Sequence, residues 1–129
     1  MNEGKAIYSI LTTDSAVSAI VSSRVYPQIA AQGAAFPFVV YVINDITPSD
    51  TKSGVSTLDE VRYEILAISE NYAEAADLNE KIRTALDRYT GTVAGVVIDS
   101  IQFTELETDY DTASETYIAN SEYIIRVKR

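Results

Sequence analysis

The sequence predicts an α+β domain: a mainly antiparallel four-stranded sheet with one long amphipathic helix packed on one face and two short amino-terminal helices. Three observations predict this fold. Four segments have the composition or the alternation of strands, one segment between the second and third of them has a helical period, and helices and strands do not alternate strictly. The 129 residues, of which 47% are hydrophobic, suffice for one domain with one core, residues 1–129.

The amino-terminal part of the chain predicts the two short helices. Apolar residues recur at helical spacing in residues 4–12 and again in residues 17–21. Thr13 or Asp14, between them, has a side chain that can cap the second helix. Residues 29–35 then show no clear period, so they predict an extended or irregular connection.

Two strands are predicted in the middle of the chain. Residues 38–43, Phe-Val-Val-Tyr-Val-Ile, form a continuous β-branched and aromatic run, which is typical of a strand buried on both faces. From Leu58 apolar and charged residues alternate, which predicts a strand with one face in water. Residues 47–56, between the two strands, are almost all loop formers, so we expect a mobile arm that orders when a partner docks.

The long amphipathic helix is predicted after the second strand. Asn71 and Glu74 have the spacing of a capping box with Asn as the cap. The apolar residues that follow recur at helical period as far as Tyr89, and they predict the face that packs on the sheet. Gly91 is expected to close the helix at its C′ position.

The carboxy-terminal third predicts the last two strands, residues 96–106 and residues 116–127. The apolar face of the first of these changes near Asp99 and Ser100, which predicts a bulge. The acidic residues 107–115 are predicted to join the two strands as a hairpin loop.

The composition excludes several kinds of chemistry. The chain has no cysteine and no histidine, which excludes disulfides, thiolate nucleophiles, Cys/His zinc sites and imidazole acid-base catalysis. Its formal net charge of −9 should repel phosphate backbones, so sequence-specific nucleic-acid binding is not expected. The first residues do not resemble a signal peptide and no apolar stretch approaches the length of a membrane span, so we expect a soluble protein with no membrane partner.

Two groups of carboxylates are weighed as chemical sites. Glu107, Asp109 and Asp111 alternate along the chain and could supply oxygen ligands for a hard cation, but an acidic hairpin in water explains them more simply. Asp59, Glu60 and Glu64 could supply paired carboxylates for hydrolysis, but Asp59 and Glu60 point to opposite faces of a strand. Only Glu60 and Glu64 share a face, which is expected to lie in water. The sequence therefore predicts no catalytic residue, no metal site and no cofactor.

Candidate interaction residues lie in the loop of residues 47–56 and at the basic carboxy terminus. They are Asp50, Lys52, Val55, Arg126, Lys128 and Arg129. The loop offers charged and apolar contacts to a docking partner, and the terminus is the only cationic cluster of an acidic chain. A solubilising end that blunts an edge strand explains the terminal cluster equally well.

The nine tyrosines also suit an interface, because each combines an apolar ring with a polar tip. About half of them are expected instead to be plain core or sheet-edge residues. These are Tyr41, Tyr63, Tyr72, Tyr89 and Tyr123.

Two stretches of the chain resemble a known family. One joins Arg-Val-Tyr-Pro at residues 24–27 to Gln-Gly-Ala-Ala-Phe-Pro-Phe-Val-Val-Tyr at residues 32–41, and the other is the helix that begins Tyr-Ala-Glu-Ala-Ala at residues 72–76. In combination these motifs resemble the tail completion, or tail terminator, family of long-tailed, siphovirus-type bacteriophages and prophages. The carboxy-terminal part is similar too, although residues 29–31 replace a stretch that usually bears proline and no aromatic residue follows Val127.

The resemblance implies a structural virion protein rather than an enzyme. It implies a closed ring, a hexamer in this family, that caps the head-proximal end of the tail tube, ends its polymerisation and provides the head-joining surface. The implied partners are other copies of the chain, the major tail tube protein and a head completion or connector protein, with DNA only passing non-specifically through the ring. The implied location is the virion tail, after assembly in the cytoplasm of the host bacterium.

Two other functions stay open at this stage. A head completion or head–tail connector subunit can share the size and acidity of this chain. A small α+β enzyme or ligand-binding domain would need an apolar pocket with convergent polar groups, and the sequence offers no such groups.

Overall fold

The computed structural model describes residues 3–29, 33–48 and 58–128 of the chain. Its helices are α1 (Glu3–Thr13), α2 (Ser15–Val21) and α3 (Tyr72–Leu86). Its strands are β1 (Val25–Pro27), β2 (Phe38–Pro48), β3 (Leu58–Ser69), β4 (Gly91–Val93), β5 (Val96–Asp111) and β6 (Thr116–Lys128). No described helix is long and apolar enough to cross a membrane.

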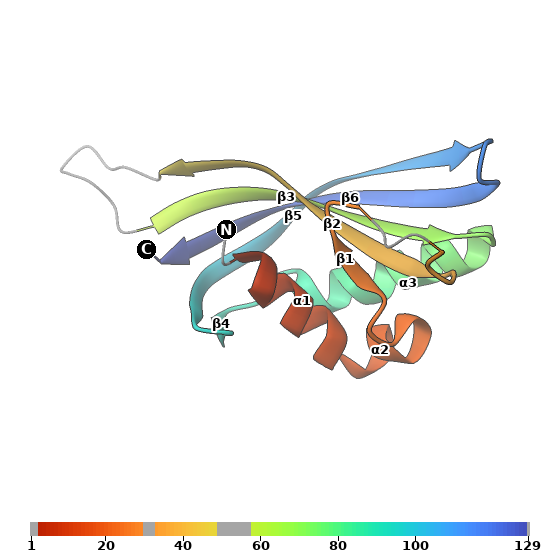
Figure 1. Ribbon diagram of the computed structural model, residues 1–129. Helices are drawn as coiled ribbons and strands as arrows, with labels where there is room; N and C mark the ends of the chain where they lie inside the picture. Colours follow the sequence, from red (N-terminus) through yellow and green to blue (C-terminus); the bar gives the residue numbers. More distant parts are fainter. Residues whose placement is uncertain (1–2, 30–32, 49–57, 129) are drawn as a thin grey trace.

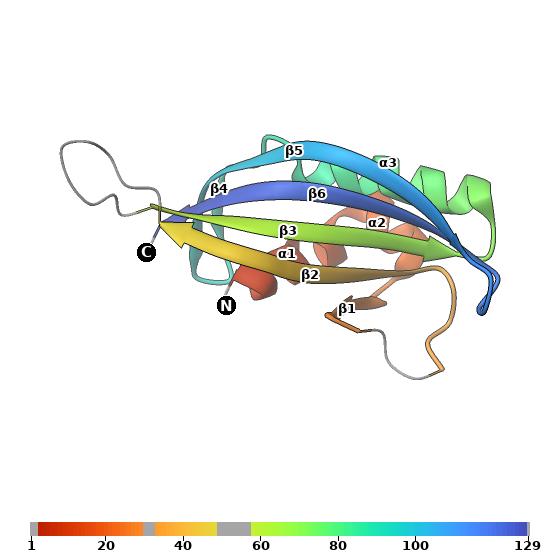
Figure 2. The ribbon, with the colours of Figure 1, turned by 90° about the horizontal axis from the view of Figure 1, so that it is seen from above.

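The described strands form one sheet in the order β1-β2-β3-β6-β5-β4. β1 runs parallel to β2, and every other neighbouring pair is antiparallel. All three helices lie on one side of the sheet (Figure 1), and the long strands are bowed and curl around this helical layer (Figure 2). The β5–β6 hairpin and the last residues of β6 therefore lie at opposite ends of the molecule.

The prediction of a four-stranded, mainly antiparallel sheet under one long helix is wrong. The described sheet has six strands and is mixed and curled, and three short helices of 11, 7 and 15 residues share its covered face. The two strands that the sequence does not reveal, β1 and β4, have three residues each. Three residues are too few to display the alternation by which a strand is recognised.

The parallel strand β1 is held in place by the residue that precedes it. The Arg24 carbonyl accepts the Val39 N–H at 3.0 Å, and the Arg24 guanidinium donates from Nε to the Pro37 carbonyl at 2.9 Å. Val25 is buried opposite Val39, so this short strand also closes one end of the core.

The core lies between the sheet and the helical layer. The alternation predicted for β3 is confirmed, because Val61, Tyr63, Ile65 and Ala67 are fully buried while the residues between them are half-exposed. The neighbouring strand β6 repeats the pattern with Tyr123. The helices supply the facing side chains, namely Ile7, Leu11, Val17, Val21, Leu78, Ile82 and Leu86.

Side-chain caps begin two of the helices. The Asp14 carboxylate accepts the N–H groups of Ala16 and Val17 at the start of α2, so of the two predicted caps the structure uses Asp14. Asn71 Oδ1 accepts the Glu74 N–H at the start of α3, as predicted. The Glu74 carboxylate does not reach the Asn71 N–H directly but accepts a hydrogen bond from the Ser69 hydroxyl, which itself accepts that N–H.

Helix α3 ends earlier than the sequence predicts. Its last residue is Leu86, and the chain turns at Arg88, which has a φ of +65°. Gly91 therefore does not close the helix as predicted but begins β4. The short turn between the helix and β4 brings Asp87 and Arg88 to the edge of β5.

The last two strands are longer than predicted. A register shift in β5 between Ile98 and Ser100 confirms the predicted bulge, and a second shift lies between Phe103 and Glu105. β5 continues to Asp111, so the predicted loop of residues 107–115 is mostly strand and only residues 112–115 form the turn.

Candidate functional site

Three tyrosines meet at the hairpin end of the molecule. Tyr72 begins α3, Tyr110 lies near the end of β5 and Tyr117 near the start of β6. The ring centroids of Tyr72 and Tyr117 lie 5.6 Å apart with the rings edge to face, and those of Tyr110 and Tyr117 lie 4.8 Å apart. Tyr72 is nevertheless 63% exposed and Tyr110 43% exposed, so large aromatic surfaces remain in contact with water.

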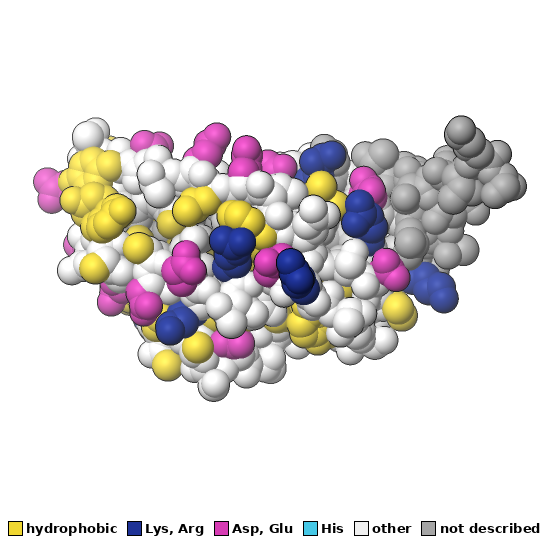
Figure 3. Space-filling model, turned by 180° about the vertical axis from the view of Figure 1, so that it is seen from behind, with side chains coloured by type: hydrophobic (Ala, Val, Ile, Leu, Met, Phe, Trp, Pro, Cys, Tyr) yellow, Lys and Arg dark blue, Asp and Glu magenta, His cyan; other side chains and the backbone are white. Residues whose placement is uncertain are grey.

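A groove of about 480 Å³ runs between α3 and the β5–β6 hairpin beside these tyrosines. Ala75 and Ala76 form the helical wall with Tyr72, and small side chains there leave the space open. The hairpin wall includes Leu106, which is 45% exposed, and Ala119. Figure 3 shows hydrophobic side chains gathered at this end, on the left of the view, with acidic side chains around them.

Asn79 of α3 gives the groove a polar group. The side chain lines the groove and is only 3% exposed, and its Oδ1 atom has no hydrogen-bond partner among the described residues. Leaving a buried acceptor unpaired costs about 1–3 kcal/mol. A donor brought by a ligand would remove this cost, so Asn79 suits a site that is completed by another molecule.

Strand β5, which forms part of the hairpin wall, also carries a row of carboxylates. Glu105, Glu107, Asp109 and Asp111 alternate with Leu106, Thr108 and Tyr110, and all four are exposed. Asp109 also lines the groove, as does Glu80 of α3. Hydrogen bonds from the Ser114 hydroxyl at 2.9 Å and from the backbone lower the pKa of Asp111. Residues 105–116 contain no lysine or arginine, so the hairpin is strongly negative. Among the described residues, no group of three or more acidic side chains is arranged to hold a metal ion.

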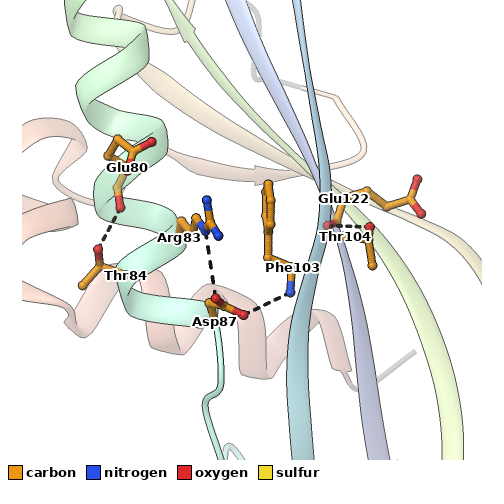
Figure 4. Close-up of polar contacts among 7 residues, drawn as sticks. All are labelled: Glu80, Arg83, Thr84, Asp87, Phe103, Thr104 and Glu122. Atoms are coloured by element: carbon orange, nitrogen blue, oxygen red, sulfur yellow. Dashed lines mark hydrogen bonds and ion pairs between the residues drawn. The ribbon is translucent and has the colours of Figure 1, made fainter.

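The first part of β5 has its outer edge covered. β4 pairs with it from Val96 to Ile98, the Arg88 N–H donates to the Ile101 carbonyl at 2.8 Å, and the Asp87 carboxylate accepts the Phe103 N–H at 3.1 Å. Figure 4 shows Asp87 and Arg83 at the end of α3 turned toward Phe103, whose ring centroid lies 4.0 Å from the Arg83 guanidinium carbon.

The second part of β5 has an open outer edge. Beyond Phe103, no described strand pairs with the side of β5 that faces away from β6. The Tyr110 N–H donates to the carboxylate of the adjacent Asp109 at 2.8 Å, as an edge amide does when no neighbouring strand accepts it. The groove, the open edge and the acidic row thus lie together along the second half of β5, residues 104–111.

The structure describes only two of the six predicted interaction residues. Arg126 donates from Nε to the Glu60 carboxylate at 3.1 Å, and its Nη2 lies 3.1 Å from the same oxygen, so it pairs across the sheet within its own chain. Lys128 is exposed at the end of β6. The remaining four, Asp50, Lys52, Val55 and Arg129, lie outside the described residues, as does most of the predicted arm.

The groove was not predicted from the sequence, because other roles were predicted for the residues of both its walls. Tyr72 was expected in the core or at the sheet edge, and residues 107–115 were expected to form a loop. The alternation of acidic residues with Leu106, Thr108 and Tyr110 was the signal of a strand with two different faces. Which of the two faces a helix would approach was not visible in the sequence.

Comparisons with known proteins place the chain in a family. Residues 5–128 match the family model described as tail completion protein gp17. Among solved structures, a chain of a particle described as the virion of a native gene transfer agent is similar over 97% of this chain and 93% of that chain. Its TM-score is 0.77 and its sequence identity is 16%, so this likeness shows a shared fold. No curated protein matches the chain.

Proposed function

The chain belongs to the tail completion protein gp17 family, and on that premise we propose that its copies form a closed ring on the head-proximal end of the tail tube. The chain is a structural component of the tail. In the proposed role the ring ends polymerisation of the tube and presents the surface to which the head joins. The observation that carries this proposal is the family match, because it spans residues 5–128 and therefore all the described strands and helices except the first two residues of α1.

The shape of the chain supports a ring. Identical subunits close a ring of more than two members through two different, complementary surfaces on each subunit. The two sides of this molecule differ, since all three described helices lie on one side of the sheet (Figure 1). A hexamer is the form we propose, with the major tail tube protein below it and a head completion or connector protein above it.

The charge of the chain supports passage of DNA through the ring. A subunit with a formal net charge of −9 repels the phosphate backbone, so DNA can slide past without being trapped. DNA contact in this proposal is non-specific. The family consists of structural virion proteins, and we infer that the chain has no catalytic role and assembles in the cytoplasm of the host bacterium.

The test is electron microscopy of particles made with and without this protein. Without it, we expect tails longer than normal that carry no heads, and the wild-type protein supplied in trans should restore normal length and joining. Tails of normal length that only fail to join would favour a head completion or connector subunit. Tails of normal length that carry heads would overturn the proposal.

A further inference from the structure

We propose that the open half of β5, together with the groove beside it, binds an extended segment of another virion protein in which apolar and basic side chains alternate. The identity of the partner as a virion neighbour rests on the proposed function. The chemistry of the segment follows from three independent features of the described residues, which are the free backbone edge, the groove with its unpaired amide oxygen, and the acidic row.

The backbone edge sets the conformation of the partner. Alternate residues of an edge strand direct their N–H and C=O groups outward, and we assign Tyr110 to them because its N–H donates to the Asp109 carboxylate on its own strand. Thr108 and Leu106 lie two and four residues before Tyr110 in β5, so their N–H groups should point outward too. Their side chains line the groove, as that of Tyr110 does. An incoming strand that pairs with these three residues continues the sheet beyond β5, which is the usual way an extended peptide adds to a free sheet edge.

The groove sets the side chains on one face of the added strand. Side chains on that face enter the space between the hairpin and α3, where they contact Tyr72, Ala76 and Leu106. These three side chains present apolar surface, so the partner's side chains that contact them should be apolar as well. Glu80 and Asp109 also line the groove and add negative charge to it. Asn79 Oδ1, buried and unpaired at the base of the same wall, can accept one donor from the partner.

The acidic row sets the side chains on the other face. Residues of the added strand that alternate with the apolar ones lie beside Glu105, Glu107 and Asp109. Opposite charges on neighbouring strands stabilise pairing, and like charges oppose it. Lysine and arginine therefore complement this face.

A second copy of the chain fits this surface less well than a basic partner. Each copy carries the same formal net charge of −9. Three of its arginines already bind carboxylates of their own chain, since Arg62 pairs with Glu122, Arg83 with Asp87 and Arg126 with Glu60. These arginines are not available to neutralise the acidic row of a neighbour.

The first test uses the purified full chain and a synthetic peptide, acetyl-Lys-Val-Arg-Val-Lys-Ile-Lys-Thr-amide. We expect saturable binding of one peptide per chain by titration calorimetry, weakened by added salt. A peptide with the same residues reordered as Lys-Lys-Lys-Arg-Val-Ile-Val-Thr should bind about tenfold more weakly, because it cannot place apolar and basic side chains on separate faces. Equal affinity for both peptides would reduce the binding to charge alone and overturn the proposal.

Backbone methylation of the peptide separates strand pairing from side-chain contact without altering the protein. One version carries N-methyl groups on the Val and Ile residues and the other carries them on the Lys and Arg residues. Only one version points its methyl groups at β5, so one should lose binding while the other keeps it. Loss in neither version would show that the peptide does not extend the sheet.

Variants of the protein locate the site. Thr108→Pro removes an outward N–H and should abolish binding, whereas the matched Thr108→Val keeps the N–H and should bind normally. Glu107→Lys with Asp109→Lys should weaken binding by about tenfold or more, while Asp77→Lys with Asp99→Lys makes the same charge change elsewhere and should not. Equal losses in both charge variants would place the peptide elsewhere.

Two separate measurements keep this proposal distinct from the proposed ring. Oligomeric state by sedimentation tests self-assembly, and tail completion by microscopy tests function. Peptide binding by a protein that does not complete tails would leave the site standing and remove the tail role. Self-association that Thr108→Pro abolishes and the peptide competes away would show that a second copy occupies the edge, and it would overturn the choice of a basic partner.

Discussion

The two halves of β5, residues 96–103 and 104–111, both show apolar and polar side chains in alternation, but they lie in different surroundings. In the first half, Val96, Ile98 and Ile101 are buried, and β4 and the end of α3 cover the outer edge. In the second half, residues 104–111 are all exposed and no described strand covers the edge. Alternation therefore identifies a strand in both halves, but only burial distinguishes the part that holds the fold from the part that is free to bind.

The largest expected effect comes from truncating one apolar side chain in each half. Ile101→Ala should lower the free energy of unfolding by about 2–5 kcal/mol, because Ile101 is 1% exposed and its removal leaves a cavity. Leu106→Ala should cost less than about 1 kcal/mol, because Leu106 is 45% exposed. Urea denaturation measures both. Equal decreases in the free energy of unfolding in the two variants would mean that the second half of β5 is part of the core that holds the fold.

An effect of intermediate size on the free energy of unfolding is expected at high pH from Tyr123. This residue pairs with Phe103 at the end of the covered half of β5. Burial raises the pKa of Tyr123 to about 12 from 10.0. A raised folded-state pKa gives stability that is complete below pH 10 and is lost as the pH rises toward 12, by about 1.4 kcal/mol per pH unit.

Comparing the wild type with Tyr123→Phe isolates this contribution, since other groups also titrate above pH 10. The difference in unfolding free energy between the two proteins should be constant below that pH and should move in favour of the Phe variant above it. A constant difference up to pH 12 would mean that the hydroxyl of Tyr123 is not held in its neutral form.

The smallest expected effect comes from Asn79 on the groove wall. Asn79→Leu should raise the free energy of unfolding by about 1 kcal/mol, because it replaces an unpaired buried polar group by an apolar one of similar size. The same variant should weaken binding of the basic peptide. Asp77→Leu, at an exposed position of α3, controls for the higher helix propensity of leucine. Destabilisation by Asn79→Leu beyond this control would show that the amide is already satisfied.

The sequence predicts those parts of the fold that repeat over enough residues to show a period. The alternation of β3, the helical stripe of α3 and its Asn71 cap were all visible, as was the bulge after Ile98. β1 and β4 were not visible, because three residues carry no period. The predicted sheet was therefore two strands short and lacked its parallel pair.

The candidate site could not be predicted because it arises from tertiary contacts. Tyr72 and Tyr117 lie far apart in the sequence, and only the pairing of α3 with the hairpin brings their rings together. The unpaired state of Asn79 Oδ1 likewise depends on which residues surround it in the folded chain. Composition favoured basic residues as the interaction site, since they are rare here, but Arg126 is bound to Glu60 within its own chain.

Amide hydrogen exchange along β5, in the free chain and with the basic peptide bound, tests the difference between the two halves most directly. We expect the amides of Ile98 and Phe103 to exchange slowly in both states, because Ile98 pairs with β4 and the Phe103 N–H is bound by the Asp87 carboxylate. The amides of Leu106 and Thr108 should exchange rapidly in the free chain and become protected when the peptide binds. Slow exchange at Leu106 and Thr108 in the free monomer, or no added protection at saturating peptide, would contradict the assignment of the second half of β5 as a binding edge.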